Sequence, residues 1–453
     1  MKPESFQQLI QALALLPHAP NSHCLSQPLC TLLFLKAWSD SWHWHSAELQ
    51  PAGHTPPDFA AAMAQRGVLA MPADTMFENC LTTSAEDRVK VIQQALMTLT
   101  IANPTLVGVL QPLQFSYLKG LYESENTDST KLAKLVGHLS QVQFEHSAPS
   151  FAIAAEFASV IQALCQNNNA RAQVVAPLFA KLVAPQGGEV VRDFACEQGH
   201  LLLACAQRLA SAQLQHPPQA PLQLIGMADN LHQWALANML LSLAGVEHMH
   251  IQRANALHKS FNDLEAPEKA RVIDGADIVV MAVPETSSAW GHALAFEQQD
   301  PRFPVRAPFD SRLALVWHGL AALKPETGRM ALMMPMAALV VTGGHALRKH
   351  LVDNNLLDAV IHLPALAGQV LLMVRAKKSQ TRIAFIHTQG RGTNSTDMAW
   401  DAWQHYQAGQ SHLSLVCLDQ RSVAANDYQF NLQMYGAEAT NFYAQTSDKV
   451  FPG

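Results

Sequence analysis

An acidic residue followed by small residues stands at the end of the first β-branched run in the second half of the chain. The run at residues 189–192 is followed by Asp193, Phe194, Ala195, Cys196, Glu197, Gln198, Gly199 and His200. An acid at a strand end accepts hydrogen bonds, and a turn of small residues lets the backbone approach a ligand closely. This arrangement suits a nucleotide-like cofactor that carries an amino acid or a ribose, although an ordinary strand-to-helix connection explains it at least as well.

Other reactive side chains have simpler explanations. Two His-x-His pairs occur, at His43 and His45 and at His248 and His250. On a strand each pair would face one side and could bind a metal, but no third ligand is evident and chance explains such pairs among 21 histidines. No metal site is predicted. Cys196 would gain thiolate character at a helix N-terminus, but a structural role is the simpler interpretation. The methionine-rich run at residues 330–336 is interpreted as a buried strand.

Hydrophobic periodicity divides the chain into a helical first part and a mixed second part. Apolar residues recur every three or four positions in the first part, which predicts helices at residues 6–16, 29–38, 89–99 and 131–139. Short β-branched runs later predict strands at residues 189–192, 222–225, 248–252, 277–281, 329–334, 357–363, 370–375 and 383–387. Helices are predicted between them at residues 201–210, 231–244 and 311–323. This alternation predicts a parallel α/β sheet with ligands at the carboxyl ends of its strands.

The composition excludes several classes of protein. Hydrophobic residues make up 49% of the 453 residues, which is too many for a disordered or fibrous chain. No apolar run approaches the length of a membrane-spanning helix, and no signal peptide is evident, so we expect no membrane partner and a cytoplasmic location. The 7 cysteines include no Cys-x-x-Cys pair, which indicates reduced thiols rather than disulfides or zinc ligands.

The net charge of −6 argues against autonomous DNA binding, but the charge is unevenly distributed. Between residues 301 and 382, 11 Lys and Arg residues outnumber 4 Asp and Glu residues, so this stretch carries +7 and the rest of the chain −13. A solvated face and a DNA-binding face explain this stretch equally well. For a DNA-binding face, the predicted phosphate contacts are Arg348, Lys349, Arg375, Lys377 and Lys378.

Segments along nearly the whole chain resemble the methylation subunits of type I restriction-modification systems, which are adenine-N6 DNA methyltransferases. Residues 173–209 are similar to the region that binds S-adenosylmethionine, with its loop motif Asp-Pro-Ala-Cys-Gly-Ser-Gly. Residues 226–246, 251–257, 277–284, 300–303, 328–335 and 343–364 follow in family order. Residues 29–40 resemble the helical N-terminal domain of these subunits, and residues 426–435 resemble a C-terminal segment.

The resemblance implies a Rossmann-like S-adenosylmethionine-dependent methyltransferase sheet with an α-helical N-terminal domain. The expected domains are a helical domain at residues 1–150, a methyltransferase-like α/β domain at residues 165–390 and a helical or irregular tail at residues 391–453. The resemblance assigns cofactor binding to Asp193, Phe194, Ala195, Cys196, Gly199, Asp229 and Asn255.

The cofactor region departs from the family pattern. Glu197 and Gln198 stand where the family has Gly and Ser. A carboxylate at residue 197 would repel the methionine carboxylate of the cofactor, and a side chain there is unfavourable if the turn needs positive φ. The family acid that binds the ribose falls on Ala228, and Asp229 would point to the opposite side of a continuing strand, although a shift by one residue would bring it into place. We therefore expect weakened cofactor binding.

The catalytic motif departs further. In the family, Asn-Pro-Pro-Phe/Tyr ends the fourth strand, where the Asn accepts a hydrogen bond from the adenine amino group and the ring stacks on the flipped base. The matching residues here are Ala282, Val283, Pro284 and Glu285. Losing the positioned acceptor costs about 3–4 kcal/mol of transition-state stabilisation, and losing the ring about 1–3 kcal/mol of base binding. No catalytic residue of the motif is intact.

The sequence therefore favours a divergent methylation subunit with an impaired transferase centre. It would act as a DNA-binding or scaffold component beside a specificity-type subunit or another protein of a defence complex. One alternative is an active adenine-N6 DNA methyltransferase with a rearranged site. Another is a protein-interaction module that binds neither DNA nor cofactor.

Overall fold

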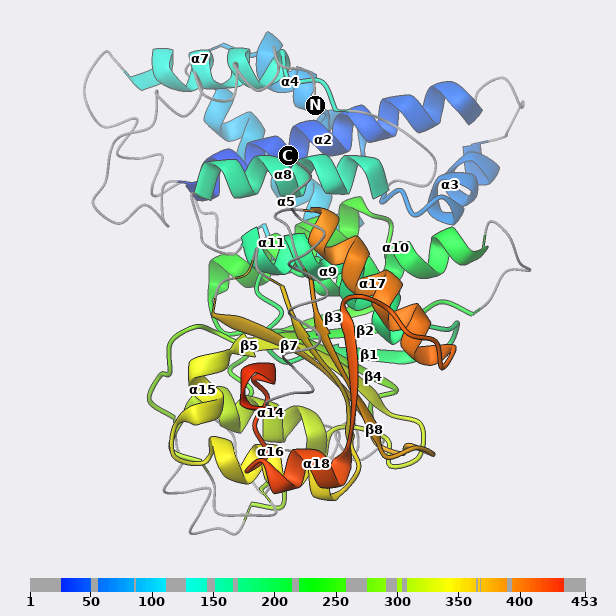
Figure 1. Ribbon diagram of the computed structural model, residues 1–453. Coiled ribbons are helices and arrows are strands. Elements are labelled where there is room, and N and C mark those ends of the chain that lie inside the picture. The colour runs from blue at the N-terminus through cyan, green and yellow to red at the C-terminus, as the bar shows by residue number, and fades with distance from the viewer. Residues whose placement is uncertain are drawn as a thin grey trace, which may run out of the picture. The chain divides into compact units, whose positions relative to one another are not determined.

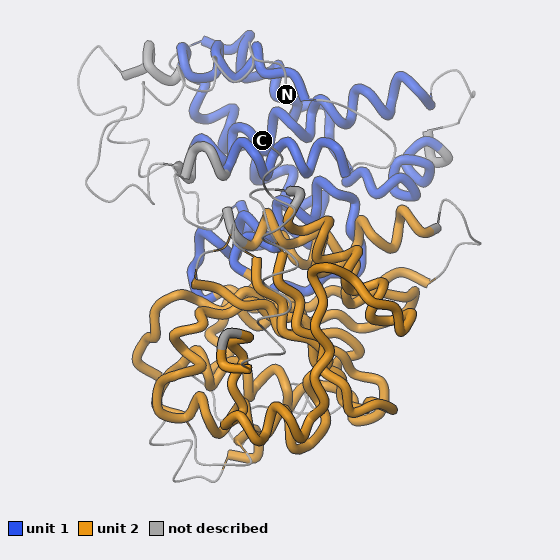
Figure 2. The backbone as a smooth tube through the Cα atoms, in the orientation of Figure 1, with its two compact units in different colours: residues 1–170, 197–199, 229–251 blue, residues 171–196, 200–228, 252–453 orange. Residues whose placement is uncertain are grey.

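The chain forms two compact units, which Figure 2 distinguishes by colour. The computed structural model describes residues 26–49, 56–84, 87–110, 128–144, 151–165, 170–213, 220–257, 275–290, 300–303, 308–363, 366, 368–388 and 393–435. Unit 1, the helical unit, comprises residues 1–170, 197–199 and 229–251. Unit 2, the sheet unit, comprises residues 171–196, 200–228 and 252–453.

The helical unit is built around one long apolar helix. Its helices are α2 (Ser26–Leu49), α3 (Pro56–Gln65), α4 (Phe77–Thr82), α5 (Arg88–Ala102), α7 (Asp128–Ser140), α8 (Phe151–Cys165) and α11 (Leu231–Leu243), with short 3-10 turns η2 (Ala73–Thr75) and η3 (Pro104–Leu106). Helix α2 packs against α8 and α11, and the ring of Phe34 on α2 meets those of Trp38 and Phe157 edge-on. Asn230 caps α11, because its side-chain oxygen accepts hydrogen bonds from the backbone N–H groups of His232 and Gln233 in the first turn.

Gly67 and Gly245 make the closest backbone approach in the helical unit. A Cβ placed on Gly67 would lie 2.6 Å from Cα of Gly245, which is far inside van der Waals contact. Both glycines also have positive φ, of 71° and 72°. The segment after α3 and the turn after α11 can therefore touch only because neither residue has a side chain.

The sheet unit contains a sheet of nine described strands in the order β3-β2-β1-β4-β5-β7-β6-β8-β9. Their bounds are β1 (Val190–Asp193), β2 (Gln223–Ala228), β3 (Met249–Arg253), β4 (Ile278–Ala282), β5 (Arg329–Pro335), β6 (Leu357–His362), β7 (Gln369–Arg375), β8 (Arg382–His387) and β9 (Leu415–Asp419). The central strands β4 and β5 consist almost entirely of buried apolar residues, because helices cover both faces of the sheet. Strands β2, β1, β4 and β5 are parallel, whereas β7 and β9 are antiparallel to their neighbours.

Helices cover both faces of this sheet, as Figure 1 shows. The helices of the sheet unit are α9 (Ala170–Val183), α10 (His200–Gln213), α14 (Ser311–Ala321), α15 (Met336–Val340), α16 (Gly344–Asp353), α17 (Thr393–Gln407) and α18 (Gln420–Ala425), with a 3-10 turn η7 (Leu432–Tyr435). Helices α14, α16 and α18 lie together on one face, and α10 and α17 lie on the other (Figure 1). Trp317 and Phe385 are among the fully buried residues of the core on the α14 face.

The fold class predicted from the sequence is confirmed, and each predicted strand and each predicted helix within the described residues is present. The helix predicted at residues 6–16 lies outside the described residues. The predicted parallel pairing holds for β2, β1, β4 and β5, whereas β7 and β9 run antiparallel to their neighbours. Only six residues separate β6 from β7, whereas a parallel connection needs about a dozen or more. The tail region likewise contains β9, a strand that the sequence analysis did not predict.

None of the helices that the structure describes is both long and apolar enough to cross a membrane.

Candidate cofactor and target-base site

The loop that follows β1 is fixed by short-range hydrogen bonds within the sheet unit. Asp193 is 1% exposed, and its Oδ1 accepts a hydrogen bond from the backbone N–H of Ala195 at 3.0 Å. The backbone N–H of Cys196 donates to the carbonyl of Met227 on β2 at 3.0 Å. Cys196 is itself buried, which favours the structural interpretation of its thiol.

The next three residues of the loop belong to the helical unit, and two of them adopt left-handed backbone conformations. Glu197 has a φ of 45° and Gly199 a φ of 82°. A Cβ on Gly199 would lie 3.3 Å from Cβ of Ala237 on α11, so the glycine is also needed for close packing. The positive φ at Glu197 is the conformation for which the family glycine is suited, and the loop keeps it at some cost in strain.

Glu197 is also electrostatically perturbed. Burial, and secondly the negative charge of Asp229, raise the pKa of Glu197 to about 7. At neutral pH this carboxyl is therefore close to half protonated, whereas an ordinary glutamate is fully ionised. The negative charge that the sequence analysis expected at this position is present in only part of the molecules.

The ends of β2 and β3 hold the residues predicted to contact the nucleoside part of a cofactor. Ala228 is the last residue of β2, and its carbonyl accepts a hydrogen bond from the backbone N–H of Ala254 at 3.0 Å. Asp229 follows the end of the strand, so strand alternation does not set its direction. The Oδ1 of Asn255 accepts a hydrogen bond from the backbone N–H of Leu257 at 2.9 Å, which orients its amide.

The carboxyl end of β4 carries the residues that match the catalytic motif. Ala282 ends the strand with a methyl group, and the backbone N–H of Val283 donates across to β5 at 2.8 Å. Pro284 and Glu285 are exposed. The Oε1 of Glu285 lies 3.4 Å from the amide nitrogen of Gln369. The strand end therefore offers no side-chain acceptor at residue 282 and no aromatic ring at residue 285.

A buried charged network lies beside the loop after β1, and the sequence analysis missed it. Arg302 and Asp300 form a bidentate ion pair, with Nη2 2.6 Å from Oδ2, and both side chains are almost completely buried. Nη1 of Arg302 also donates to the carbonyl of Ala256 and to Nδ1 of His318, each at 3.0 Å. Residues 300–303 were recognised only by their place in the family order. A lone histidine in an apolar helix such as α14 has no motif that identifies it.

The five basic residues predicted to bind phosphate have other contacts. Arg348 is 5% exposed and donates from Nη1 to the carbonyl of Leu339 at 2.8 Å. Lys378 is also buried and donates to the carbonyl of Arg382 at 2.9 Å. Nζ of Lys378 also lies 3.9 Å from Oδ1 of Asp358, and the other three are in ion pairs as well: Lys349 with Asp353, Arg375 with Asp358, and Lys377 with Glu326.

DNA contact by these five residues stays a prediction, and the structure reduces the number of side chains that are free to make it. The side chains of Lys349 and Lys377 are 52% and 67% exposed, so they can reach a phosphate group. Arg348 and Lys378 cannot do so without leaving internal contacts.

The metal interpretation of the His-x-His pairs gains no support within the described residues. His43 and His45 lie on α2, where residues two apart face different sides. The described chain brings together one set of potential ligands, Asp401, His405 and His412. Nε2 of His412 lies 3.1 Å from Oδ2 of Asp401, and Nδ1 of His405 lies 2.9 Å from the carbonyl of that aspartate. These contacts account for the cluster without an ion.

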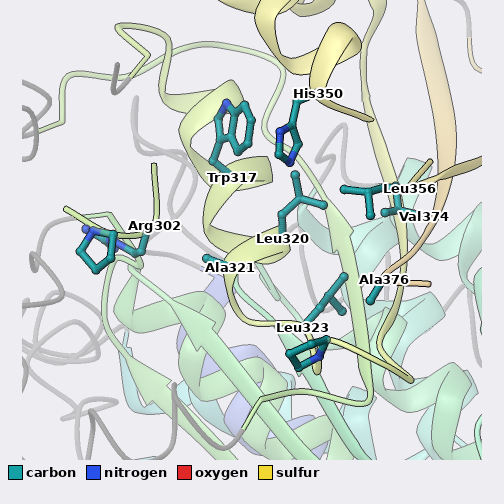
Figure 3. Close-up of a pocket in the computed structure, with 11 residues that line it drawn as sticks. Arg302, Trp317, Leu320, Ala321, Leu323, His350, Leu356, Val374 and Ala376 are labelled. Atoms are coloured by element: carbon teal, nitrogen blue, oxygen red, sulfur yellow. The ribbon is translucent and has the colours of Figure 1, made fainter. Parts of the chain in front are cut away.

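Two cavities lie among the described residues away from the predicted site. The first has a volume of about 380 Å³ and lies at the amino-terminal edge of the sheet, where the side chains of Leu320, His350 and Val374 converge (Figure 3). The second has a volume of about 290 Å³ and lies in the helical unit, beside Gly67 and Gly245. Neither cavity is lined by a residue predicted to bind the cofactor or the target base.

The fold and this site define the class of protein. A mostly parallel sheet with an antiparallel β7 between β5 and β6, and with an aspartate at the carboxyl end of β1, is a Rossmann-like methyltransferase-type fold. The family described as N-6 DNA Methylase matches residues 172–441, which is more than half of the chain, and the chain belongs to that family. This confirms the resemblance to adenine-N6 DNA methyltransferases. No curated protein matches the chain significantly.

Solved structures share the fold over nearly the whole length of the chain. One is the methyltransferase subunit of a type I restriction-modification system from Streptococcus thermophilus, with a TM-score of 0.75, 18% identity and coverage of 95% of this chain and 98% of that chain. Another, from Vibrio vulnificus, is described as a modification subunit of a type I restriction enzyme, with a TM-score of 0.60, 14% identity and coverage of 92% of each chain. At such identities the likeness shows the fold alone.

Proposed function

We propose that this chain is a methylation-type subunit of a type I restriction-modification system or of a related defence complex, with an impaired transferase centre. It would act as a DNA-binding or scaffold component beside a specificity-type subunit. Membership of the N-6 DNA Methylase family supports the proposal, as does the likeness to a type I methyltransferase subunit over 95% of the chain.

The proposal of an impaired transferase centre rests on the side chains at the carboxyl end of β4. Ala282 is almost buried at the strand end and has only a methyl group to present to a target base. Glu285 is exposed and presents a carboxyl group where the family has the ring that stacks on the flipped base. A missing acceptor lowers the rate about a hundred- to thousandfold, and the missing ring weakens binding of the base.

S-adenosylmethionine is the cofactor that this family implies. The loop after β1 suits this cofactor when the carboxyl group of Glu197 is protonated. Two features support this fit: Asp193 accepts a hydrogen bond from the N–H of Ala195, and Gly199 has a left-handed backbone conformation. A protonated Glu197 is compatible with the carboxylate of a bound methionine group, whereas an ionised Glu197 repels it. We propose that the chain retains cofactor binding in weakened form, with Asp193 and Asn255 as its polar contacts.

The contacts of the basic residues favour a second candidate function, a protein-interaction module without DNA binding. Lys349, Arg375, Lys377 and Lys378 each have an acidic partner, and Arg348 and Lys378 donate to backbone carbonyls. Ion pairing of this kind reduces the positive potential that attracts a phosphate backbone.

The test is methyl transfer from labelled S-adenosylmethionine to unmethylated DNA by the full chain with any co-purifying partner. We expect incorporation no higher than that of an Asp193→Ala variant, which removes the loop acid. Incorporation well above this control would contradict the impaired centre and support the active-enzyme alternative. DNA retention is measured with the same preparation, and its absence at low salt would favour the interaction module.

A further inference from the structure

Phe194 couples the loop after β1 to the buried network on α14. Its ring meets the imidazole of His318 at 89°, with the two ring centroids 4.3 Å apart. Phe194 is 5% exposed and His318 is 5% exposed, so the contact is shielded from water. A shielded contact between perpendicular rings is stabilising and fixes the orientation of both rings.

The network on the other side of His318 fixes which nitrogen carries its proton. Arg302 has only donors, so Nδ1 of His318 must accept its hydrogen bond and the proton resides on Nε2. Burial, and secondly the charge of Arg302, lower the pKa of His318 to about 3, so the ring is neutral at physiological pH. Asp300 holds the guanidinium in place through two oxygens. The imidazole next to Phe194 therefore has a single orientation and a single protonation state.

The ring contact between Phe194 and His318 compensates for a difference from the family motif at residue 194. The family motif has proline there, and a proline ring restricts φ of the residue at the start of the loop. Phe194 lacks this restriction, so an unsupported loop would sample more conformations. Packing of the Phe194 ring against His318 restrains the loop in place of the covalent ring of a proline.

We propose that His318 is a positioning residue: oriented by the Asp300–Arg302 pair, it supports Phe194 and thereby fixes the loop Asp193–Cys196 in its binding-competent conformation. The proposal deepens the proposed function, because it rests on that loop being the cofactor-binding loop. It concerns the conformation of the loop and not methyl transfer, so the two can fail separately.

The test is hydrogen–deuterium exchange of peptides spanning residues 190–199 in the full chain without cofactor. His318→Asn keeps an acceptor for Arg302 but has no ring to support Phe194. We expect exchange at the loop amides to become about tenfold faster or more in this variant. Phe194→Pro in the same background restores the family restraint and should return exchange to near the wild-type rate. His350→Asn is the matched control, since that ring packs on Trp317 of the same helix but not on the loop.

A general loss of stability would speed exchange in peptides throughout the sheet unit, so faster exchange confined to residues 190–199 distinguishes positioning from general packing. Unchanged loop exchange in His318→Asn would overturn the proposal, and so would faster exchange that Phe194→Pro does not reduce. If His318→Asn fails to fold, His318→Phe serves in its place. It keeps a ring against Phe194 but offers no acceptor to Arg302, so a loop that exchanges faster than wild type supports the orienting role of the Asp300–Arg302 pair, and a loop at the wild-type rate contradicts that role. Methylation by the wild-type chain would overturn the proposed function while leaving this result standing.

Discussion

Glu197 and Asp229 are two carboxyl groups of the helical unit whose charges interact, and the pKa of Glu197 is raised to about 7. Burial is the larger cause and the charge of Asp229 the second. Residue 197 stands where the family motif has a glycine, and the proposed function places it near the carboxylate of the cofactor. Under that proposal, a glutamate there would make cofactor binding depend on a proton.

Cofactor affinity should therefore rise as the pH falls. With a pKa of about 7, the protonated fraction of Glu197 increases about tenfold between pH 8 and pH 6, so the Kd for S-adenosylmethionine should fall by up to tenfold. Calorimetric titration at several pH values measures this change. The isosteric variant Glu197→Gln should bind with the tighter affinity throughout, and an equally steep pH dependence in that variant would assign the effect to another group.

The same carboxyl should affect stability with a defined sign. The folded state raises the pKa of Glu197 from 4.5 to about 7, so the folded chain binds the extra proton between these values. The contribution of Glu197 to stability is greatest below pH 4.5 and is lost as the pH rises to 7 and above. Glu197→Gln should therefore increase the free energy of unfolding at pH 8, by at most about 3 kcal/mol, and have little effect at pH 4.5. Chemical denaturation at both pH values measures the difference, and a larger gain at pH 4.5 would contradict the assignment.

The contact between Gly67 and Gly245 should be intolerant of any side chain. Gly67→Ala would place Cβ 2.6 Å from Cα of Gly245 and would also strain a φ of 71°. We expect a loss of about 3 kcal/mol or more in the free energy of unfolding. Gly409→Ala is the matched control, because Gly409 has a φ of 68° but no atom within 4 Å of the added Cβ. The control should lose only about 1 kcal/mol, and equal losses would show that the close approach does not matter.

The predicted phosphate contacts should separate into two groups. Arg348→Gln and Lys378→Gln remove buried side chains that donate to backbone carbonyls, so each should lower the free energy of unfolding by about 1–3 kcal/mol. Lys349→Gln and Lys377→Gln act on exposed ion pairs and should change stability by less than about 1 kcal/mol. If these two lysines contact DNA, each substitution should reduce the slope of the logarithm of the DNA-binding constant against the logarithm of the salt concentration by about one. An unchanged slope in both would remove them from the DNA interface.

The sequence predicted the sheet well because its strands are short β-branched runs separated by helical periodicity. It did not predict β9, since residues 415–419 lie in a region whose composition indicated an irregular tail. Within the site, the strand-end positions of Asp193 and Ala282 were predictable, because each ends an apolar run. The contacts of Arg302 and His318 were not, because 16 positions separate them in the chain and only the fold joins them. Charge counting also failed to show that most of the described basic residues in the +7 stretch are in ion pairs.

Restoring the family motif at the end of β4 should restore methyl transfer if the rest of the centre is intact. Ala282→Asn returns the acceptor for the adenine amino group, and Glu285→Tyr returns the stacking ring. We expect the double variant to incorporate label into DNA at least a hundredfold above the wild-type chain, since one such acceptor accounts for about that factor. Glu285→Tyr alone is the control, because it restores the ring but leaves Ala282 without an acceptor. A double variant that binds both DNA and S-adenosylmethionine yet remains inactive would show that the impairment lies outside these two positions, with Glu197 the next residue to change.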